Sequence, residues 1–168
     1  MPSPSSPTIR EVRVRAVRVP LPEPHRTASG VVAESPLVLT DVLTDAGILG
    51  HSLVFTYTPA ALKPTAELIR NLGPLVEGQA LAPAAIEQDL ARRFRLLGTQ
   101  GLVGMALAAL DMALWDALAR FHEVSIVRLL GGLERPIPAY AGLGFDGADG
   151  CGRAAERWAE HFCASPLE

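Results

Sequence analysis

Lysine is nearly absent from this 168-residue sequence, because Lys63 is the only lysine among 15 basic residues and the others are arginines. Lysine is the usual base where a buried amine must lose its proton near neutral pH. The printed residues therefore exclude a catalytic motif built from several lysines. They also exclude a phosphate-binding loop of the form Gly-x-x-x-x-Gly-Lys.

Cysteine and an excess of either charge are also lacking. Cys151 and Cys163 form neither a disulfide framework nor a metal-ligand spacing, so we expect free thiols in a reducing cytoplasm. With 15 basic and 18 acidic side chains the net charge is −3, without the basic excess that nucleic-acid binding requires. We interpret the arginines of residues 13–18 as a solvated strand face and predict no nucleic-acid partner.

Long apolar runs are limited to one segment, residues 101–119. Asp111 and Asp116 lie inside it, and each would cost about 2.5–3.5 kcal/mol at a bilayer centre. The first eight residues, "MPSPSSPT", lack the apolar run of a signal peptide and predict a disordered tail over residues 1–8. We therefore expect a soluble, cytoplasmic protein without a membrane partner.

Alternating apolar and polar residues predict three strands in the first third of the sequence. "VRVRAVRV" (12–19) has the period of a half-buried strand, and three prolines at 20–24 are expected to end it. Residues 21–36 then predict a polar loop, long enough to be a functional lid. Strands over 37–44 and 48–57, joined by a tight Asp-Ala-Gly turn, complete an antiparallel meander.

Helical periodicity follows the strands. Thr58 is a suitable N-cap for a helix over 59–72, which Gly73-Pro74 should end. Pro83 opens a second helix with an apolar stripe, and a third is predicted over 102–121.

A final strand–helix unit is predicted near the C-terminus. Residues 137–144 are apolar throughout, as in a strand buried on both faces, and a helix is expected over about 153–163. One βα unit cannot close a barrel. The predicted fold class is therefore α+β, a three-stranded meander and a helical bundle followed by one βα unit of a truncated (β/α)₇β barrel.

Four short segments occur in an order that resembles a known family. "VPL", "GHSLVFTYTP", "LDMALWDALAR" and "LLGG", spread over residues 9–147, resemble the mandelate racemase / muconate lactonizing enzyme branch of the enolase superfamily. The resemblance implies an N-terminal capping domain over residues 9–135. It also implies that residues 136–168 are the first strand and helix of an incomplete barrel domain.

The resemblance further implies the chemistry of the parent enzyme. In the family, barrel carboxylates bind Mg²⁺, and barrel Lys and His residues move a proton α to a carboxylate, while the metal stabilises the enediolate. The family's Lys-x-Lys base motif has no counterpart here, since Lys63 lies in the first predicted helix. We therefore expect a capping-domain fragment, catalytically silent by itself, of a racemase or acid-sugar dehydratase that acts on a 2-hydroxy carboxylate.

A second interpretation stays open, that of a free-standing, non-catalytic binding or assembly module derived from a cap domain. A compact species with little exposed apolar surface would favour it, whereas a fragment should expose the surface where the barrel docks. The resemblance also implies a homo-oligomer.

The resemblance assigns substrate contact, but no catalytic or metal-binding role, to residues of this chain. The positions that match the family's substrate-enclosing segments are His25, Thr27, Val32, Phe55 and Tyr57. Ordinary strand packing is the alternative for Phe55 and Tyr57, and simple solvation for His25. The racemase has an apolar side chain where His25 stands, which favours a more polar substrate than an aryl acid. Where Gly142 stands, the racemase has a serine that contacts the substrate carboxylate, and that contact would be lost here.

The two aspartates of "LDMALWDALAR" raise the question of a carboxylate pair. Asp111 and Asp116 are five residues apart, so they lie about 140° apart around a helix and cannot share one site. Asp116 stands four residues before Arg120, which favours an ion pair along the helix. Asp111 has Trp115 one turn away and no basic partner within the helix. Separately, His51 is a lone histidine in a predicted strand and is expected to be structural.

Overall fold

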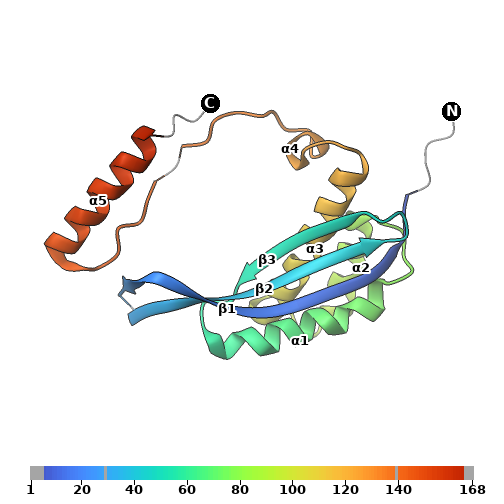
Figure 1. Cartoon of the computed structure of the whole chain (residues 1–168). Coiled ribbons are helices and arrows are strands. Elements are labelled where there is room, and N and C mark those ends of the chain that lie inside the picture. The colour runs from blue at the N-terminus through green and yellow to red at the C-terminus, as the bar shows by residue number, and fades with distance from the viewer. Residues whose placement is uncertain (1–5, 29, 139, 165–168) are drawn as a thin grey trace. The chain divides into compact units, whose positions relative to one another are not determined.

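The computed structural model describes residues 6–28, 30–138 and 140–164, with side chains as far as residue 160. Two compact units are present. The first consists of Met1–Val19 with Pro36–Gly132, and the second of Pro20–Ser35 with Leu133–Glu168. Because the positions of the parts relative to one another are not determined, each unit is described by itself (Figure 1).

The sheet is an antiparallel meander, as predicted. Its strands β1 (Ile9–Thr27), β2 (Gly30–Thr44) and β3 (Leu49–Phe55) follow one another in the order β1-β2-β3. The register of β2 and β3 places Leu37 opposite Phe55 and Leu43 opposite Leu49. The tight turn between these strands is confirmed by a hydrogen bond of 2.9 Å from the Thr44 amide to the Ile48 carbonyl.

The loop predicted over residues 21–36 is wrong, because β1 and β2 continue through most of that segment as a long hairpin. The prolines at 20–24 do not stop β1. Proline lacks an amide donor, but β1 is an edge strand, where one row of amides has no neighbour to bond. The fixed φ of proline also suits extended backbone.

Three helices and a short fourth one follow the sheet in the first unit. They are α1 (Pro59–Val76), α2 (Pro83–Phe94), α3 (Gly101–Phe121) and α4 (Ile126–Leu129). The Thr58 side chain accepts a hydrogen bond from the Ala60 amide, which confirms the predicted N-cap. However, α1 does not end at Gly73-Pro74, since its last turn buries Val76 completely.

The core of the first unit lies between one face of the sheet and the helices. Alternate residues of β2 point into it, and the buried set on β2 consists of Pro36, Val38, Thr40, Val42 and Thr44. From α3 the core receives small and branched side chains at helical spacing, namely Ala106, Ala109, Leu110, Ala113, Leu114 and Ala117. By length and composition α3 could cross a membrane, but here these residues pack against β3, α1 and α2.

The predicted tail is partly ordered. The Pro7 carbonyl accepts a hydrogen bond of 2.7 Å from the Leu81 amide. The Thr8 amide and hydroxyl donate to the Asp45 carboxylate at 2.9 and 2.7 Å, and these bonds lower the pKa of Asp45. The prediction of disorder is therefore wrong for residues 7 and 8, while residues 1–5 lie outside the described residues.

In the second unit, the helix predicted over 153–163 is present as part of α5 (Gly147–Ala164). The strand predicted over 137–144 is not found in the described residues of that segment, which have no strand pairing. Tyr140 is 94% exposed. A strand that is buried on both faces needs neighbouring strands, and every described strand belongs to the three-stranded meander.

Candidate functional site

Phe55 and Tyr57, two of the predicted substrate contacts, lie where β3 leads into α1. Their rings pair with centroids 4.8 Å apart and planes inclined by 48°. The Tyr57 ring is not core packing, because the residue is 77% exposed, whereas Phe55 is half-buried. The pair therefore presents an accessible aromatic surface at this end of the first unit.

The backbone at Tyr57 has an unusual conformation. Its φ is +60°, which is rare for a bulky residue that is not glycine. The Thr58 amide donates to the Thr56 carbonyl at 2.6 Å, so the chain reverses around the single residue Tyr57 in a γ-turn. Such strained turns persist only where their surroundings hold them, and they concentrate at functional sites.

Helix α3 fixes the position of β3. The Cβ of any residue larger than glycine at position 50 would lie 2.2 Å from the Ala113 carbonyl oxygen and 2.5 Å from the Ala117 nitrogen. Ser52 Oγ donates to the Ala109 carbonyl at 2.5 Å. The strand that carries Phe55 is thus held by direct contact with the helix backbone.

Asp116 is a structural residue that joins α3 to β3. Its Oδ2 accepts a hydrogen bond of 2.8 Å from the backbone amide of His51 and another of 2.8 Å from Arg120 Nε. The expected pair with Arg120 is confirmed. His51 is also structural, since its Nδ1 lies 2.8 Å from Asp41 Oδ1, and Asp41 in turn accepts from Arg15 at 2.9 Å.

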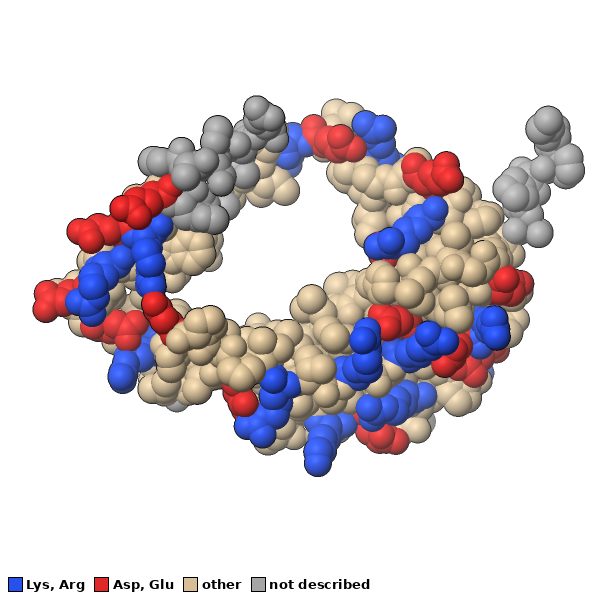
Figure 2. All heavy atoms as spheres, viewed as in Figure 1, with Lys and Arg blue, Asp and Glu red and all other residues tan. Residues whose placement is uncertain are grey.

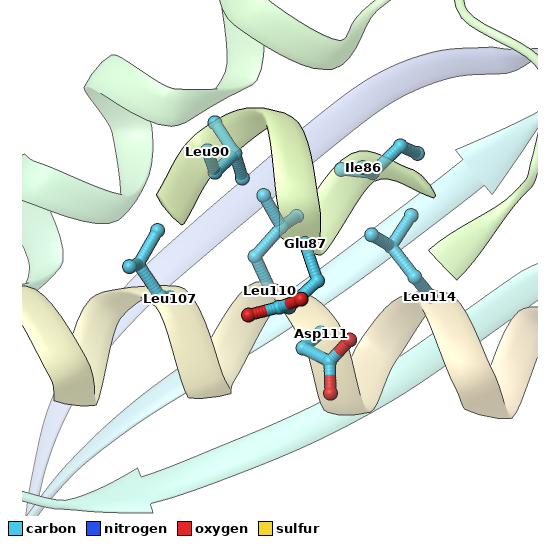
Figure 3. A pocket seen from close by; sticks show the side chains of 7 residues that line it. All are labelled: Ile86, Glu87, Leu90, Leu107, Leu110, Asp111 and Leu114. Atoms are coloured by element: carbon cyan, nitrogen blue, oxygen red, sulfur yellow. The ribbon is translucent and has the colours of Figure 1, made fainter. Parts of the chain in front are cut away.

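Asp111 lies apart from Asp116, beside a small groove between α2 and α3 (Figure 3). Burial raises the pKa of Asp111, the nearby Glu87 carboxylate raises it further, and a hydrogen bond from the Trp115 side chain partly offsets both effects. The cavity measures about 20 Å³, which is room for about one water molecule. This groove is too small to be a substrate site.

The other predicted contacts, His25, Thr27 and Val32, belong to the second unit. His25 is exposed and lines a wide groove together with Arg26, Asp146 and the side of α5. Thr27 and Val32 are half-buried, and the Thr27 hydroxyl donates to the Gly30 carbonyl at 2.9 Å near the hairpin turn. No common pocket for all five residues can be described, because Phe55 and Tyr57 belong to the first unit.

Ion pairs hold the second unit together. Arg26 Nε lies 3.0 Å from Asp146 Oδ1, and the Phe145 amide donates to the Arg26 carbonyl at 3.0 Å. Arg157 of α5 pairs with Glu23, and this contact lowers the pKa of Glu23. Charges of both signs are also interspersed on the face of the molecule shown in Figure 2.

The described residues do not fit a Mg²⁺ site of the kind that the resemblance implies. Such a site needs several oxygen ligands around one ion. Among the residues that the structure describes, no three or more His, Cys, Asp or Glu side chains gather in this way. Lys63, the one lysine, lies on α1, and Cys151 of α5 is a free thiol.

Sequence reasoning missed the residues that shape the Tyr57 turn. Thr56, between two aromatic residues, is only 2% exposed and bonds to Pro36 across the sheet. The segment "FTYTP" contains only a weak indication of this role. Its first threonine stands between two aromatic residues, so in a strand it faces the opposite side from them and is expected to need a buried hydrogen-bond partner. The partner itself depends on the register of β2 and β3.

A three-stranded meander with its helices packed on one face, followed by residues of a second unit, has the architecture of an enolase-superfamily capping domain. The sequence matches the profile of the family described as mandelate racemase / muconate lactonizing enzyme, N-terminal domain, over residues 9–131. The chain therefore belongs to this family.

Solved structures of longer proteins resemble this chain. An enolase from Bradyrhizobium, complexed with magnesium and mandelic acid, is 45% identical with a TM-score of 0.82, over 96% of this chain and 44% of its own. An enolase from the alphaproteobacterium BAL199 with bound magnesium is 29% identical with a TM-score of 0.86, over 93% of this chain and 44% of its own.

A curated relative is also longer than this chain and matches nearly all of it. The D-galactarolactone cycloisomerase of Agrobacterium fabrum is 31% identical over 95% of this chain and 43% of its own length. The 168-residue chain thus spans about two fifths of the length of the relatives it matches.

Proposed function

We propose that this chain is the capping domain of a Mg²⁺-dependent enzyme that abstracts the α-proton of a small 2-hydroxy carboxylate, as a racemase or an acid-sugar dehydratase. The observation that carries the proposal is the family match over residues 9–131. It is supported by the likeness to a structure that contains both magnesium and mandelic acid. We place the enzyme in the cytoplasm.

Within this reaction, the residues of this chain enclose the substrate and exclude water. Phe55 and Tyr57 are the aromatic substrate contacts that we propose on the first unit. His25, Thr27 and Val32 are the contacts that we propose on the hairpin. Mg²⁺, when bound in a barrel domain, would stabilise the negative charge that develops on the carboxylate. We propose that the base and the metal ligands come from that domain; among the described residues, no three or more His, Cys, Asp or Glu side chains gather to hold a metal ion.

The alternative, a free-standing module, is less well supported by the surface of the first unit. Leu96 is 93% exposed and Leu97 is 74% exposed in the segment between α2 and α3. Exposed apolar residues of this kind are typical of a domain that associates with another surface. We propose that the chain functions together with a barrel domain and forms a homo-oligomer with it, without a nucleic-acid or membrane partner.

The test compares the chain alone with a chimera. The chimera joins residues 1–168 to the part of the Bradyrhizobium enolase that follows the matched region. Exchange of the mandelate α-proton in D₂O with Mg²⁺, followed by ¹H NMR, should occur with the chimera and not with the chain alone. The Bradyrhizobium part without any cap is the control and should show at most slow exchange.

Two outcomes would contradict the proposal. Exchange by the highly purified 168-residue chain itself would show that it holds a base of its own. A folded chimera that neither exchanges the α-proton nor dehydrates an acid sugar would remove the capping role. A compact monomer that binds little of a dye specific for exposed apolar surface would favour the free-standing module.

A further inference from the structure

Two non-glycine residues in the described part of the chain have a positive φ. Only one of them lies at a position where a positive φ is common. Glu123, with φ +54°, follows the end of α3, where left-handed residues are common. Tyr57, with φ +60°, lies between a strand and the N-cap of a helix. A bulky side chain in that conformation requires a physical cause.

The local topology leaves a single residue for the change of direction. Thr56 still belongs to the sheet pairing, since its amide donates to the Pro36 carbonyl at 3.0 Å. Thr58 already serves α1, because its φ is −133° and its side chain caps the Ala60 amide. The whole change of chain direction between β3 and α1 therefore takes place at Tyr57.

The Thr56 side chain connects both sides of this turn. Its Oγ1 lies 3.2 Å from the Pro36 carbonyl oxygen and 3.3 Å from the Thr58 carbonyl oxygen. A hydroxyl has one proton, which these two acceptors share. Since Thr56 is 2% exposed, water does not replace these bonds readily.

The Tyr57 ring cannot hold the turn by its own packing. The residue is 77% exposed, and its ring contacts that of half-buried Phe55. We infer that Thr56 is a positioning residue whose hydroxyl holds the strained turn and thereby presents the Tyr57 ring to the substrate. This inference rests on the proposed function for its second half, while the turn itself is testable in the chain alone.

The first measurement uses the full 168-residue chain and the isosteric substitution Thr56→Val. The expected result is a changed three-bond HN–Hα coupling at residue 57, together with at least tenfold faster amide exchange at Thr58. Thr56→Ser keeps the hydroxyl and should restore both values. A coupling at residue 57 that is unchanged in Thr56→Val would overturn the inference.

Thr65→Val is a matched control. Thr65 is also a fully buried threonine, but its Oγ1 has no hydrogen-bond partner among the described residues. Removing this hydroxyl should leave the signals of residues 57 and 58 unchanged. If Thr65→Val altered them as much as Thr56→Val, the effect would be general to the core, and the inference would fall.

A second variant keeps the test valid if Thr56→Val does not fold. Asparagine tolerates the left-handed region, so Tyr57→Asn should relieve the strain and lower the unfolding equilibrium constant about fivefold. An unfolding constant that stays the same or rises would show that residue 57 stores no strain, and would count against the inference.

The last measurement is kinetic and uses the chimera. Thr56→Val should raise KM about fivefold and change kcat by less than about twofold. A Tyr57 ring that is held less firmly weakens the binding of the substrate and of the transition state equally. An unchanged KM would overturn the positioning role. An inactive parent chimera would instead contradict the proposed function, and the NMR measurements would still decide whether Thr56 holds the turn.

Discussion

The two compact units of this chain are stabilised in different ways. The first has a continuous apolar core that includes Ile69, Leu110 and Val38, all fully buried. In the second, Ala154 is the one buried apolar residue described, and the prominent contacts are exposed ion pairs such as Arg26 with Asp146. A buried Leu or Ile contributes about 1.5–3 kcal/mol, whereas an exposed ion pair contributes about 0–1 kcal/mol.

This difference indicates which unit has a core sufficient to fold independently. The first unit has enough buried surface to define one packing arrangement, and it holds β3 against α3 at backbone distance. The second unit should open at a lower free energy, because salt and water compete for its contacts. The positions of the predicted hairpin contacts therefore depend on packing against further surfaces. This dependence is greater than for Phe55 and Tyr57, which the first unit holds.

The largest effect is expected from Gly50→Ala in the first unit. The new methyl group would overlap the Ala113 carbonyl and the Ala117 amide, which are helix backbone and cannot move aside. We expect a loss of more than about 3 kcal/mol of unfolding free energy, at the upper end of overpacking effects. Urea denaturation followed by circular dichroism would measure it.

Gly152→Ala in α5 is the matched control from the second unit. Nothing lies within 4 Å of a Cβ at that position. Alanine favours a helix over glycine by about 0.8–1.0 kcal/mol, so amide exchange in α5 should slow. Equal losses of stability in Gly50→Ala and Gly152→Ala would refute the contrast between the units.

Asp116→Ala should have the next largest effect. It leaves the His51 amide and Arg120 without their shared acceptor, and we expect a loss of about 1–3 kcal/mol. Asp116→Asn retains an oxygen for the His51 amide and should lose less. Denaturation of both variants measures the difference, and identical losses would show that charge alone matters.

Asp111→Asn should give a smaller effect of opposite sign, which depends on pH. The raised pKa means that the folded chain holds this proton more tightly than the unfolded chain, so ionisation costs stability as the pH rises through its ordinary value of 3.8. The variant should therefore melt at a higher temperature than the parent at about pH 7. The two should converge at about pH 3, where both states are protonated.

The smallest effect is expected from Arg157→Gln in the second unit. Removing the partner of Glu23 should speed amide exchange in α5 at low salt and leave the melting of the first unit unchanged. Because salt screens exposed pairs, the difference should disappear at about 1 M NaCl. A large loss of global stability would mean that this ion pair is more than a surface contact.

Much of the first unit was predictable from local patterns. Alternation in β2 and β3, the Asp-Ala-Gly turn, the Thr58 cap and the helix beginning at Pro83 are all confirmed. Each depends on neighbours within a few residues, where the chemistry of single residues decides the conformation. The Asp116–Arg120 pair is confirmed for the same reason.

The errors occur where distant residues decide. The prolines at 20–24 predicted a loop, but an edge position lets β1 continue past them. The apolar segment 137–144 predicted a strand, yet a strand needs partners that periodicity cannot supply. The role of the substrate contacts, from His25 to Tyr57, stays a prediction.

By itself the sequence determined the α+β class, the order of the three strands and the long helices of the first unit, and the family, because these follow from periodicity, capping residues and short motifs. Only the tertiary structure decided that Asp116 bonds to the His51 amide and that Gly50 admits no side chain. It also decided that Thr56 reaches Pro36 and so holds the turn at Tyr57. These contacts join residues 20 to 65 positions apart, and chain-distant partners meet only after the sheet and α3 have packed.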